Sequence, residues 1–290
     1  MSVEAERRLV ILCPNPDKDQ DFAFTRQVKE LLESEGFEVR VSPELVDREE
    51  DSLPADLEYS DLYACLPEAV LVVSLGGDGT ILHTARRMIG YPTPIIGVNL
   101  GTVGFLAELE RSELRRLVDA AKGNFVPSPR MMLRVEVERG GELVYATYAL
   151  NDVSLHGVVR MIHMTVRGDG RKLLEFSGDG VVIASPTGST AYSMSAGGPL
   201  VEPTAENIIM TPICAHALAA RSIVFAPERV VTVTLGSLRG SAIVSADGGN
   251  FEIYSGDILR VYKAKHRTMI AHVGEKAFID IVYEKLGDRT

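Results

Sequence analysis

Tryptophan is absent from this sequence, cysteine occurs only three times, and no uninterrupted apolar run approaches the roughly 18 residues that a membrane-spanning helix needs. Cys13, Cys65 and Cys214 are far apart and odd in number, so neither a disulfide framework nor a CxxC metal site is indicated. The first residues, MSVEAERRLVIL, contain no cationic segment followed by a long apolar stretch, so they do not predict a signal peptide. We therefore expect a cytoplasmic protein with no membrane partner.

Positive charge is also scarce, with 30 Lys and Arg against 40 Asp and Glu and a net charge of −10. This balance argues against nucleic acid or an anionic membrane as a partner, because both need a positive field. It leaves room for a phosphorylated ligand, which needs only a local set of donors. The 290 residues, 46% of them hydrophobic, can bury a sizeable core and suggest two domains.

The first part of the chain alternates between strand and helix patterns. Residues 9–12 and 69–73 are continuously apolar, which is typical of parallel strands covered on both faces. Residues 24–35 carry apolar side chains at helical spacing, and Gly36 supplies a stop. The alternation continues to about residue 125, so we expect an open α/β sheet.

The pattern changes after Pro127 and Pro129. Residues 133–137 alternate with period two, Gly140-Gly141 makes a tight turn and residues 143–150 return, which predicts a β-hairpin. Further β-rich stretches follow up to about residue 262.

We therefore expect two domains. The first is an α/β domain of residues 1–126 with an open parallel sheet, to which the tail 266–290 returns. The second is a β-rich, sandwich-like domain of residues 127–265. Within the tail, residues 277–283 fit either a strand or a short helix.

A glycine-rich loop, Gly76-Gly77-Asp78-Gly79-Thr80, follows the buried strand and precedes an expected helix. Its glycines let backbone N–H groups approach a ligand closely, and the positive end of the helix favours an anion such as phosphate. Asp78 would repel a phosphate unless it had a role of its own. Two roles fit this carboxylate: a base toward an attacking hydroxyl, or a ligand of a magnesium ion that bridges phosphates.

This Gly76–Thr80 loop is neither of the better-known phosphate loops. A P-loop needs GxxxxGK[ST], and no Gly-Lys-Ser/Thr occurs in the chain. A dinucleotide fingerprint needs GxGxxG, but Leu82 occupies the position of the third glycine. A purely structural alternative, a tight strand-to-helix turn capped by Asp78, stays open on the pattern alone.

Further glycine-rich segments follow. Residues 97–105 come after the next strand, and two such turns at one sheet edge would form opposite walls of a cleft. Residues 177–180 and 187–199 combine glycine and small hydroxyl residues with Tyr192, which offers a stacking face. The alternative for these residues is a polar surface loop, although the apolar residues 181–184 lead into it as a buried strand.

Together these segments resemble the NAD kinase family. The resemblance rests on GGDGT at 76–80, GVNLGTVGFL at 97–106, LNDV at 150–153, SGDGVVIASPTGSTAYSMSAGGPLVEP at 177–203, TPICAHALAARSIV at 211–224 and SADGG at 245–249. GGDGT alone is shared with diacylglycerol- and sphingosine-type lipid kinases, whereas the PTGSTAY…SAGGP run is much more specific.

The resemblance implies ATP- and Mg²⁺-dependent phosphorylation of the 2′-hydroxyl of the adenosine ribose of NAD, which yields NADP. It also implies a two-domain fold with the site in the cleft, a homodimer or homotetramer, no tightly bound organic cofactor and no fixed protein site for the metal. Asp78 would be the base that takes the hydroxyl proton. Gly76, Gly77 and Thr80 would form the phosphate loop.

The implied NAD-binding residues come from both halves of the chain. Tyr192 would stack on or flank a base. Asn151 and Asp152 would bind polar atoms of ribose and base, unless they form only an Asx-type turn. The whole set is Gly79, His83, Phe105, Asn151, Asp152, Asp179, Thr187, Thr190, Ala191, Tyr192, Ser193, Ser195 and Asp247.

Four positions depart from the family pattern. Asp152 stands where many members have Glu, and Gly249 stands where they have Gln. Ala215 replaces a frequent Pro, and Ser177 lies where some members carry Arg. None of these changes touches Asp78, so they concern affinity more than the reaction.

Two other functions stay open. A lipid kinase would need an exposed apolar or basic docking surface, which the net charge of −10 and the lack of an amphipathic cationic helix oppose. A non-catalytic sensor of NAD(H) or NADP(H) would keep the pocket, and an intact Asp78 argues against it.

Overall fold

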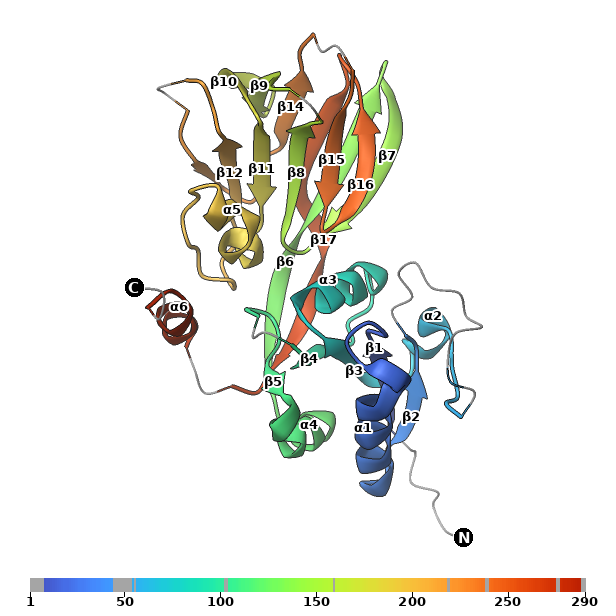
Figure 1. Ribbon diagram of the computed structural model, residues 1–290. Coiled ribbons are helices and arrows are strands. Elements are labelled where there is room, and N and C mark those ends of the chain that lie inside the picture. The colour runs from blue at the N-terminus through green and yellow to red at the C-terminus, as the bar shows by residue number, and fades with distance from the viewer. Residues whose placement is uncertain are drawn as a thin grey trace. The chain divides into compact units, whose positions relative to one another are not determined.

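The computed structural model describes residues 8–43, 54, 56–101, 104–158, 160–217, 220–237, 240–274 and 277–287. The chain divides into two compact units, Met1–Pro129 with Thr268–Thr290, and Arg130–Arg267. The boundaries fall within two long strands, β6 (Val126–Arg139) and β17 (Ile258–His272) (Figure 1). Thr102 and Val103 of the second glycine-rich turn lie outside the described residues.

The first unit is built on a parallel sheet. Its order is β2 (Glu38–Val41), β1 (Leu9–Pro14), β3 (Ala69–Gly76) and β4 (Ile95–Asn99), with the short β5 (Leu109–Glu110) and the end of β17 beside β4. All six residues of β1 and all five of β4 are buried, as the continuous apolar runs predict.

Helices lie on both faces of this sheet. The helices and 3₁₀ turns of the unit are η1 (Gln20–Phe22), α1 (Ala23–Ser34), α2 (Leu62–Cys65), α3 (Asp78–Arg87), η3 (Arg111–Glu113), α4 (Leu114–Ala121) and α6 (Phe278–Gly287). Val28 of α1 and Leu117 of α4 share one core with Val10 and alternate residues of the strands. On the opposite face, Thr84 of α3 makes a hydrogen bond with the buried thiol of Cys13. This two-sided cover matches the α/β architecture predicted from the alternation.

The second unit is a β-sandwich. Its six-stranded antiparallel sheet has the order β13 (Ile223–Phe225), β12 (Ile208–Ile213), β11 (Gly180–Ala184), β8 (Asp152–Gly157), β15 (Ala242–Ala246) and β16 (Gly249–Ile253). The facing strands are β10 (Arg171–Gly178), β9 (Ile162–Gly168), β14 (Val231–Leu235), β17, β6 and β7 (Glu142–Ala149). One core holds side chains from both layers, among them Val181 and Val233. The predicted fold class, an α/β unit plus a β-rich sandwich, is confirmed.

Two details complete the fold. The hydroxyl-rich segment forms η4 (Thr187–Thr190) and α5 (Tyr192–Ser195) after β11. Residues 277–283, which fitted a strand or a helix, belong to α6. None of the helices in the described ranges is long and apolar enough to cross a bilayer.

Candidate functional site

Three loops meet at the carboxyl edge of the parallel sheet in the first unit. The loop after β1 is tied to β3, because Asn15 N donates to Leu75 O at 2.9 Å. The loop after β4 is tied to the same strand, since Leu100 N donates to Gly76 O at 2.6 Å. Open α/β sheets bind ligands at such edges.

Asp78 is held by a segment from a different loop. Its Oδ2 accepts a hydrogen bond from Phe105 N at 2.7 Å, and its Oδ1 accepts from Leu106 N at 3.1 Å and Ala107 N at 3.3 Å. Gly77, not Asp78, occupies the N-cap position of α3. Asp78 therefore does not cap the helix, and its carboxylate holds the loop at Phe105 to Ala107 instead.

Gly104 is a glycine because the carboxylate needs the space. A β-carbon at this position would lie 1.9 Å from Asp78 Oδ1, far inside van der Waals contact. The three hydrogen bonds occupy both lone-pair positions of Oδ1 and one of Oδ2. Asp78 is thus fixed in place with one acceptor position left on Oδ2 among the described residues.

Thr80 organises the Gly76–Thr80 loop from inside. Its side chain is 4% exposed, and its Oγ1 accepts from Gly77 N at 3.3 Å and from Asn15 Nδ2 at 3.2 Å. Gly79, next to it, is exposed. His83 lies half-buried one turn further along α3, where burial first, and then Arg86 and Arg87, lower its pKa.

Lys18 approaches the same loop and was missed by the sequence patterns. It follows β1, the sheet neighbour of β3, and a β-carbon at Gly77 would lie 2.5 Å from its Nζ. No motif marks this lysine, because its contact with Gly77 spans almost sixty residues of chain. The signal that could have found it is the position of its loop, directly after a strand expected beside β3.

A cavity of about 490 Å³ adjoins the loop that holds Asp78. Phe105 lines it, and Lys285 Nζ of α6 lies 4.1 Å from the centroid of the Phe105 ring. Burial lowers the pKa of Lys285, while the charge of Asp78 opposes that shift. His272 and Glu108 line the same cavity, and His272 Nδ1 lies 2.9 Å from Glu108 Oε2.

In the second unit, Asp247 shapes the turn that precedes β8. Its Oδ2 accepts from Leu150 N at 2.6 Å, and its Oδ1 accepts from the N–H groups of Asn151 and Asp152, each at 3.1 Å. Asp247 and Gly248, at φ 43° and 85°, form the hairpin turn between β15 and β16. The carboxylate of Asp247 thus fixes the backbone of the predicted Asn151–Asp152 pair and acts as a positioning group.

Asp152 is a weaker acid than an ordinary aspartate, because its pKa is raised. Burial, together with the nearby charge of Asp247, raises the pKa of its carboxyl to about 7, against a hydrogen bond from Tyr192 N that lowers it. Asp152 therefore exchanges its proton close to neutral pH and can act as donor or acceptor toward a ligand.

Tyr192 joins a small cluster around Asp152. Its ring stacks on His156, with centroids 5.5 Å apart and planes 23° apart. Asp179 makes a side-chain hydrogen bond with Cys214 and acts on the pKa of both His156 and Tyr192. His156 was missed by the sequence patterns, although it shares one face of β8 with Asp152 by the period-two rule.

The hydroxyl-rich segment is buried over η4 and more exposed after it. Thr187, Thr190 and Ser193 are buried, and Ser193 Oγ lies 3.2 Å from Thr211 Oγ1, whereas Tyr192 and Ser195 are exposed and Ala191 is half-buried. The polar-surface-loop alternative is therefore excluded for residues 187–190, whereas residues 195–199 are partly exposed. Asn151 Oδ1 and Thr187 Oγ1 are buried without a hydrogen-bond partner among the described residues. Such atoms are costly unless a ligand or water satisfies them.

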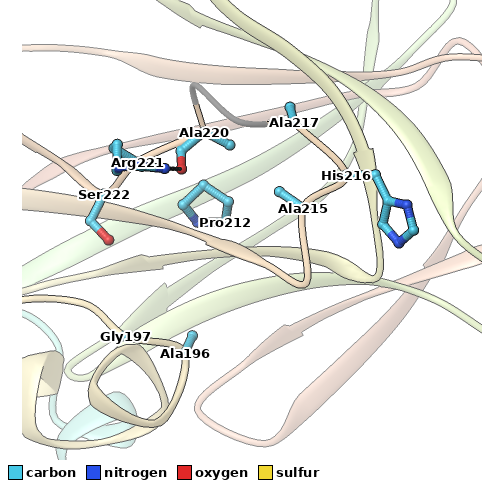
Figure 2. A pocket seen from close by; sticks show the side chains of 9 residues that line it. All are labelled: Ala196, Gly197, Pro212, Ala215, His216, Ala217, Ala220, Arg221 and Ser222. Atoms are coloured by element: carbon cyan, nitrogen blue, oxygen red, sulfur yellow. Dashed lines mark hydrogen bonds between the residues drawn. The ribbon is translucent and has the colours of Figure 1, made fainter.

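A second cavity, of about 760 Å³, lies beside this segment (Figure 2). Ala196 and Gly197 form one wall, and the stretch after β12, with His216 and Arg221, forms the other. Arg221 Nη1 donates to Ala220 O at 3.0 Å. None of the residues predicted to bind NAD lines this cavity.

The predicted residues thus fall into two groups. The first unit holds Gly76, Gly77, Asp78, Gly79, Thr80, His83 and Phe105. The second unit holds Asn151, Asp152, Asp179, Thr187, Thr190, Ala191, Tyr192, Ser193, Ser195 and Asp247.

Comparison with known families matches both halves of the chain. The ATP-NAD kinase N-terminal domain matches residues 10–122, and the ATP-NAD kinase C-terminal domain matches residues 150–273. The NAD kinase of Ruminiclostridium cellulolyticum is 35% identical over 280 residues, covering 95% of this chain and 96% of its own. The NAD kinase of Geotalea daltonii is 39% identical over 226 residues, covering 76% and 80%.

Solved structures agree with the sequences. Yeast NADH kinase, crystallised with NADH, has a TM-score of 0.85 at 25% identity and covers 98% of this chain and 89% of its own. An NAD kinase from Archaeoglobus fulgidus in complex with ATP has the same fold, with a TM-score of 0.72 at 24% identity and coverage of 98% and 100%. The chain therefore belongs to the NAD kinase family.

Proposed function

We propose that this chain transfers the terminal phosphoryl group of ATP to the 2′-hydroxyl of the adenosine ribose of NAD, with Asp78 as the base. As a member of the NAD kinase family, the chain is an NAD kinase that phosphorylates NAD to NADP. The observation that supports the role of Asp78 is its geometry: three backbone N–H groups hold the carboxylate and leave one acceptor position on Oδ2.

The reaction then follows from that position. A hydroxyl bound at Oδ2 gives its proton to Asp78 while its oxygen attacks the γ-phosphorus of ATP. The bond from this phosphorus to the bridging oxygen breaks, and ADP leaves. A base of this kind contributes about 10²–10⁴-fold. Most of the remaining acceleration in phosphoryl transfer comes from positioning and charge neutralisation.

Mg²⁺ belongs, in this proposal, to the ATP phosphates. In the described part of the chain no three His, Cys, Asp or Glu side chains gather as a metal site. Mg²⁺ usually keeps several waters and binds through substrate phosphates and one or two carboxylates. When bound with ATP it offsets the phosphate charge, while the single open position on Asp78 serves the hydroxyl.

The second unit supplies the groups that suit NAD. Asn151 Oδ1 and Thr187 Oγ1 are buried polar atoms in need of partners, which polar atoms of a nucleotide can provide. Tyr192, backed by the His156 ring, offers an aromatic face to a base. Asp152, close to its pKa at neutral pH, can donate to or accept from a ribose or base. A lipid alcohol offers few polar atoms beyond one hydroxyl and no base to stack on Tyr192, so it suits this set of groups less well.

A coupled assay tests the proposal. The protein is incubated with ATP, Mg²⁺ and NAD, and NADP is detected with an NADP-specific dehydrogenase, with diacylglycerol in a parallel reaction. NADP formation with no diacylglycerol phosphorylation is expected. Binding of NAD without NADP formation would instead identify a sensor and overturn the proposal.

We also propose a homodimer or homotetramer and a cytoplasmic location. Exposed apolar side chains on strands of the second unit, Leu143, Val144, Leu173 and Val224, suit burial against another copy. Size-exclusion chromatography with light scattering tests the assembly, and a monomer at micromolar concentration would contradict it. Cell fractionation tests the location.

A further inference from the structure

We propose that Lys18 binds the terminal phosphates of ATP and takes the part that the lysine of a P-loop takes in other nucleotide-binding proteins. This inference rests on the proposed function, because it names a further residue for the same reaction. The chain contains no Gly-Lys-Ser/Thr, so its glycine-rich loop has no lysine of its own. The loop after β1 instead places Lys18 beside the glycine-rich loop.

The ammonium of Lys18 lies in the space that the missing side chain of Gly77 leaves open, within van der Waals reach of Gly101. A β-carbon at Gly77 would lie 2.5 Å from Lys18 Nζ, and one at Gly101 would lie 3.8 Å away. Gly77 ends the turn from β3, and Gly101 follows β4. Lys18 Nζ thus lies beside the loop after β3 and the loop after β4. Gly77, its neighbour in the first of these loops, directly precedes Asp78 in the sequence.

The main chain that carries Lys18 is firmly held. Asn15 O accepts hydrogen bonds from Lys18 N at 3.1 Å and from Asp19 N at 3.0 Å. Asp19 is 3% exposed, and its carboxylate accepts from Phe24 N at 3.0 Å and Thr25 N at 2.8 Å at the start of α1. Asn15 also binds Thr80 of the glycine-rich loop. The lysine therefore projects from a backbone anchored both to α1 and to the loop that it approaches.

Within the described ranges, no carboxylate forms an ion pair with Lys18. The residue is exposed, and none of the ion pairs among the described residues includes it. Most other cations of this unit pair with acids, as Lys122 does with Glu35 at 2.6 Å. An unpaired ammonium on a flexible stem is a good phosphate ligand, because it acts as a point charge with three donors.

The position also agrees with the chemistry. Phosphoryl transfer spreads negative charge over the γ-phosphate oxygens, and a lysine at this point neutralises part of that charge. The carboxylate of Asp78 is committed to the loop at Phe105 to Ala107 on one side. Lys18 would then hold the donor phosphates while Asp78 receives the proton of the acceptor hydroxyl.

The test compares Lys18→Ala and Lys18→Arg with Lys122→Ala, a matched removal of a lysine in the same unit. For each full-length variant, kcat and the KM values for ATP and NAD are measured, together with the Kd for MgATP by calorimetry without NAD. Loss of a charge-assisted hydrogen bond corresponds to about 10–100-fold. We expect kcat/KM for ATP to fall by that factor in Lys18→Ala, with KM for NAD and the melting temperature unchanged. Lys18→Arg should restore most of the loss, and Lys122→Ala should match the wild type.

Two results would overturn the inference. One is an unchanged kcat/KM and Kd for ATP in Lys18→Ala. The other is an equal loss for ATP and NAD with a lower melting temperature, which marks a structural role. The MgATP titration separates the two proposals: if the wild type forms no NADP, the proposed function fails, whereas a weaker MgATP affinity of Lys18→Ala still supports Lys18 as a phosphate ligand.

Discussion

Asp78 Oδ2 accepts a hydrogen bond from the backbone N–H of Phe105 at 2.7 Å, across 27 residues of sequence. The contact joins the two glycine-rich segments that the sequence placed after neighbouring strands. It also gives each segment a defined task. The first provides the carboxylate, and the second, from Gly104 to Ala107, holds it in one orientation.

Gly104→Ala should displace the carboxylate of Asp78, the proposed base. The new β-carbon would lie 1.9 Å from Asp78 Oδ1, so the carboxylate or the loop must move. We expect kcat to fall by about 10²-fold, the loss associated with a misplacement of about 1 Å. Overpacking should cost about 1–3 kcal/mol of unfolding free energy.

Gly101→Ala is the matched control for this change, since its β-carbon meets only Lys18 Nζ, at 3.8 Å. Steady-state kinetics and urea unfolding of both variants check the prediction. Equal activity of the two variants would show that the absence of a side chain at Gly104 is not needed to hold Asp78 in place.

Asp247→Ala should lower the free energy of unfolding and raise KM for NAD together. Three N–H groups of the Leu150–Asp152 turn would lose their acceptor, at a cost of about 1–3 kcal/mol. Asp247→Asn should cost less, because asparagine keeps one oxygen and tolerates the positive φ of 43°.

Asp169→Ala is the control that separates the loss of stability from the change in KM for NAD. Asp169 is also at positive φ, at 48°, and accepts from Val230 N at 3.0 Å, away from the predicted NAD-binding residues. It should lose stability with KM for NAD unchanged. A KM for NAD equal to that of the wild type in Asp247→Ala would show that Asp247 does not contribute to NAD binding.

Asp152 predicts a pH dependence of stability. Its pKa is raised to about 7, so between about pH 4 and 7 the native state holds a proton that the unfolded state has lost. The free energy of unfolding contributed by this group must therefore fall as the pH rises through that window and level off above it. Asp152→Asn cannot ionise and should gain melting temperature relative to the wild type from pH 4 to pH 8. Calorimetric scans check this, with Asp119→Asn on α4 as a control, and a constant difference across the range would contradict it.

Local patterns were enough to predict most of the fold. Continuous apolar runs predicted β1 and β3, and period-two alternation with Gly140-Gly141 predicted the β6–β7 hairpin. Only the tail stayed ambiguous. Its apolar residues fit a strand or a helix, and α6 contains no buried residue whose packing could have decided between them.

The candidate site was less accessible to sequence reasoning. The family resemblance named Asp78, but not the three N–H groups that orient it, because hydrogen bonds between distant loops leave no periodic signal. Lys18 and His156 were missed for the same reason: each lies beside a residue distant in the sequence, Gly77 or Tyr192, and neither belongs to a motif. Burial of Thr187 and Ser193 was hidden as well, since small hydroxyl residues resemble a surface loop until their partners are placed.

The most direct measurement of the central claim is the rate of NADP formation by Asp78→Asn at saturating ATP, Mg²⁺ and NAD. Asparagine has almost the same shape but cannot take a proton from the 2′-hydroxyl. The account predicts turnover lower by about 10²–10⁴-fold, with the Kd for NAD close to that of the wild type. The free energy of unfolding should fall by about 1–3 kcal/mol, because the amide group of asparagine leaves at least one of the three N–H donors without an acceptor. Turnover equal to that of the wild type would contradict Asp78 as the base.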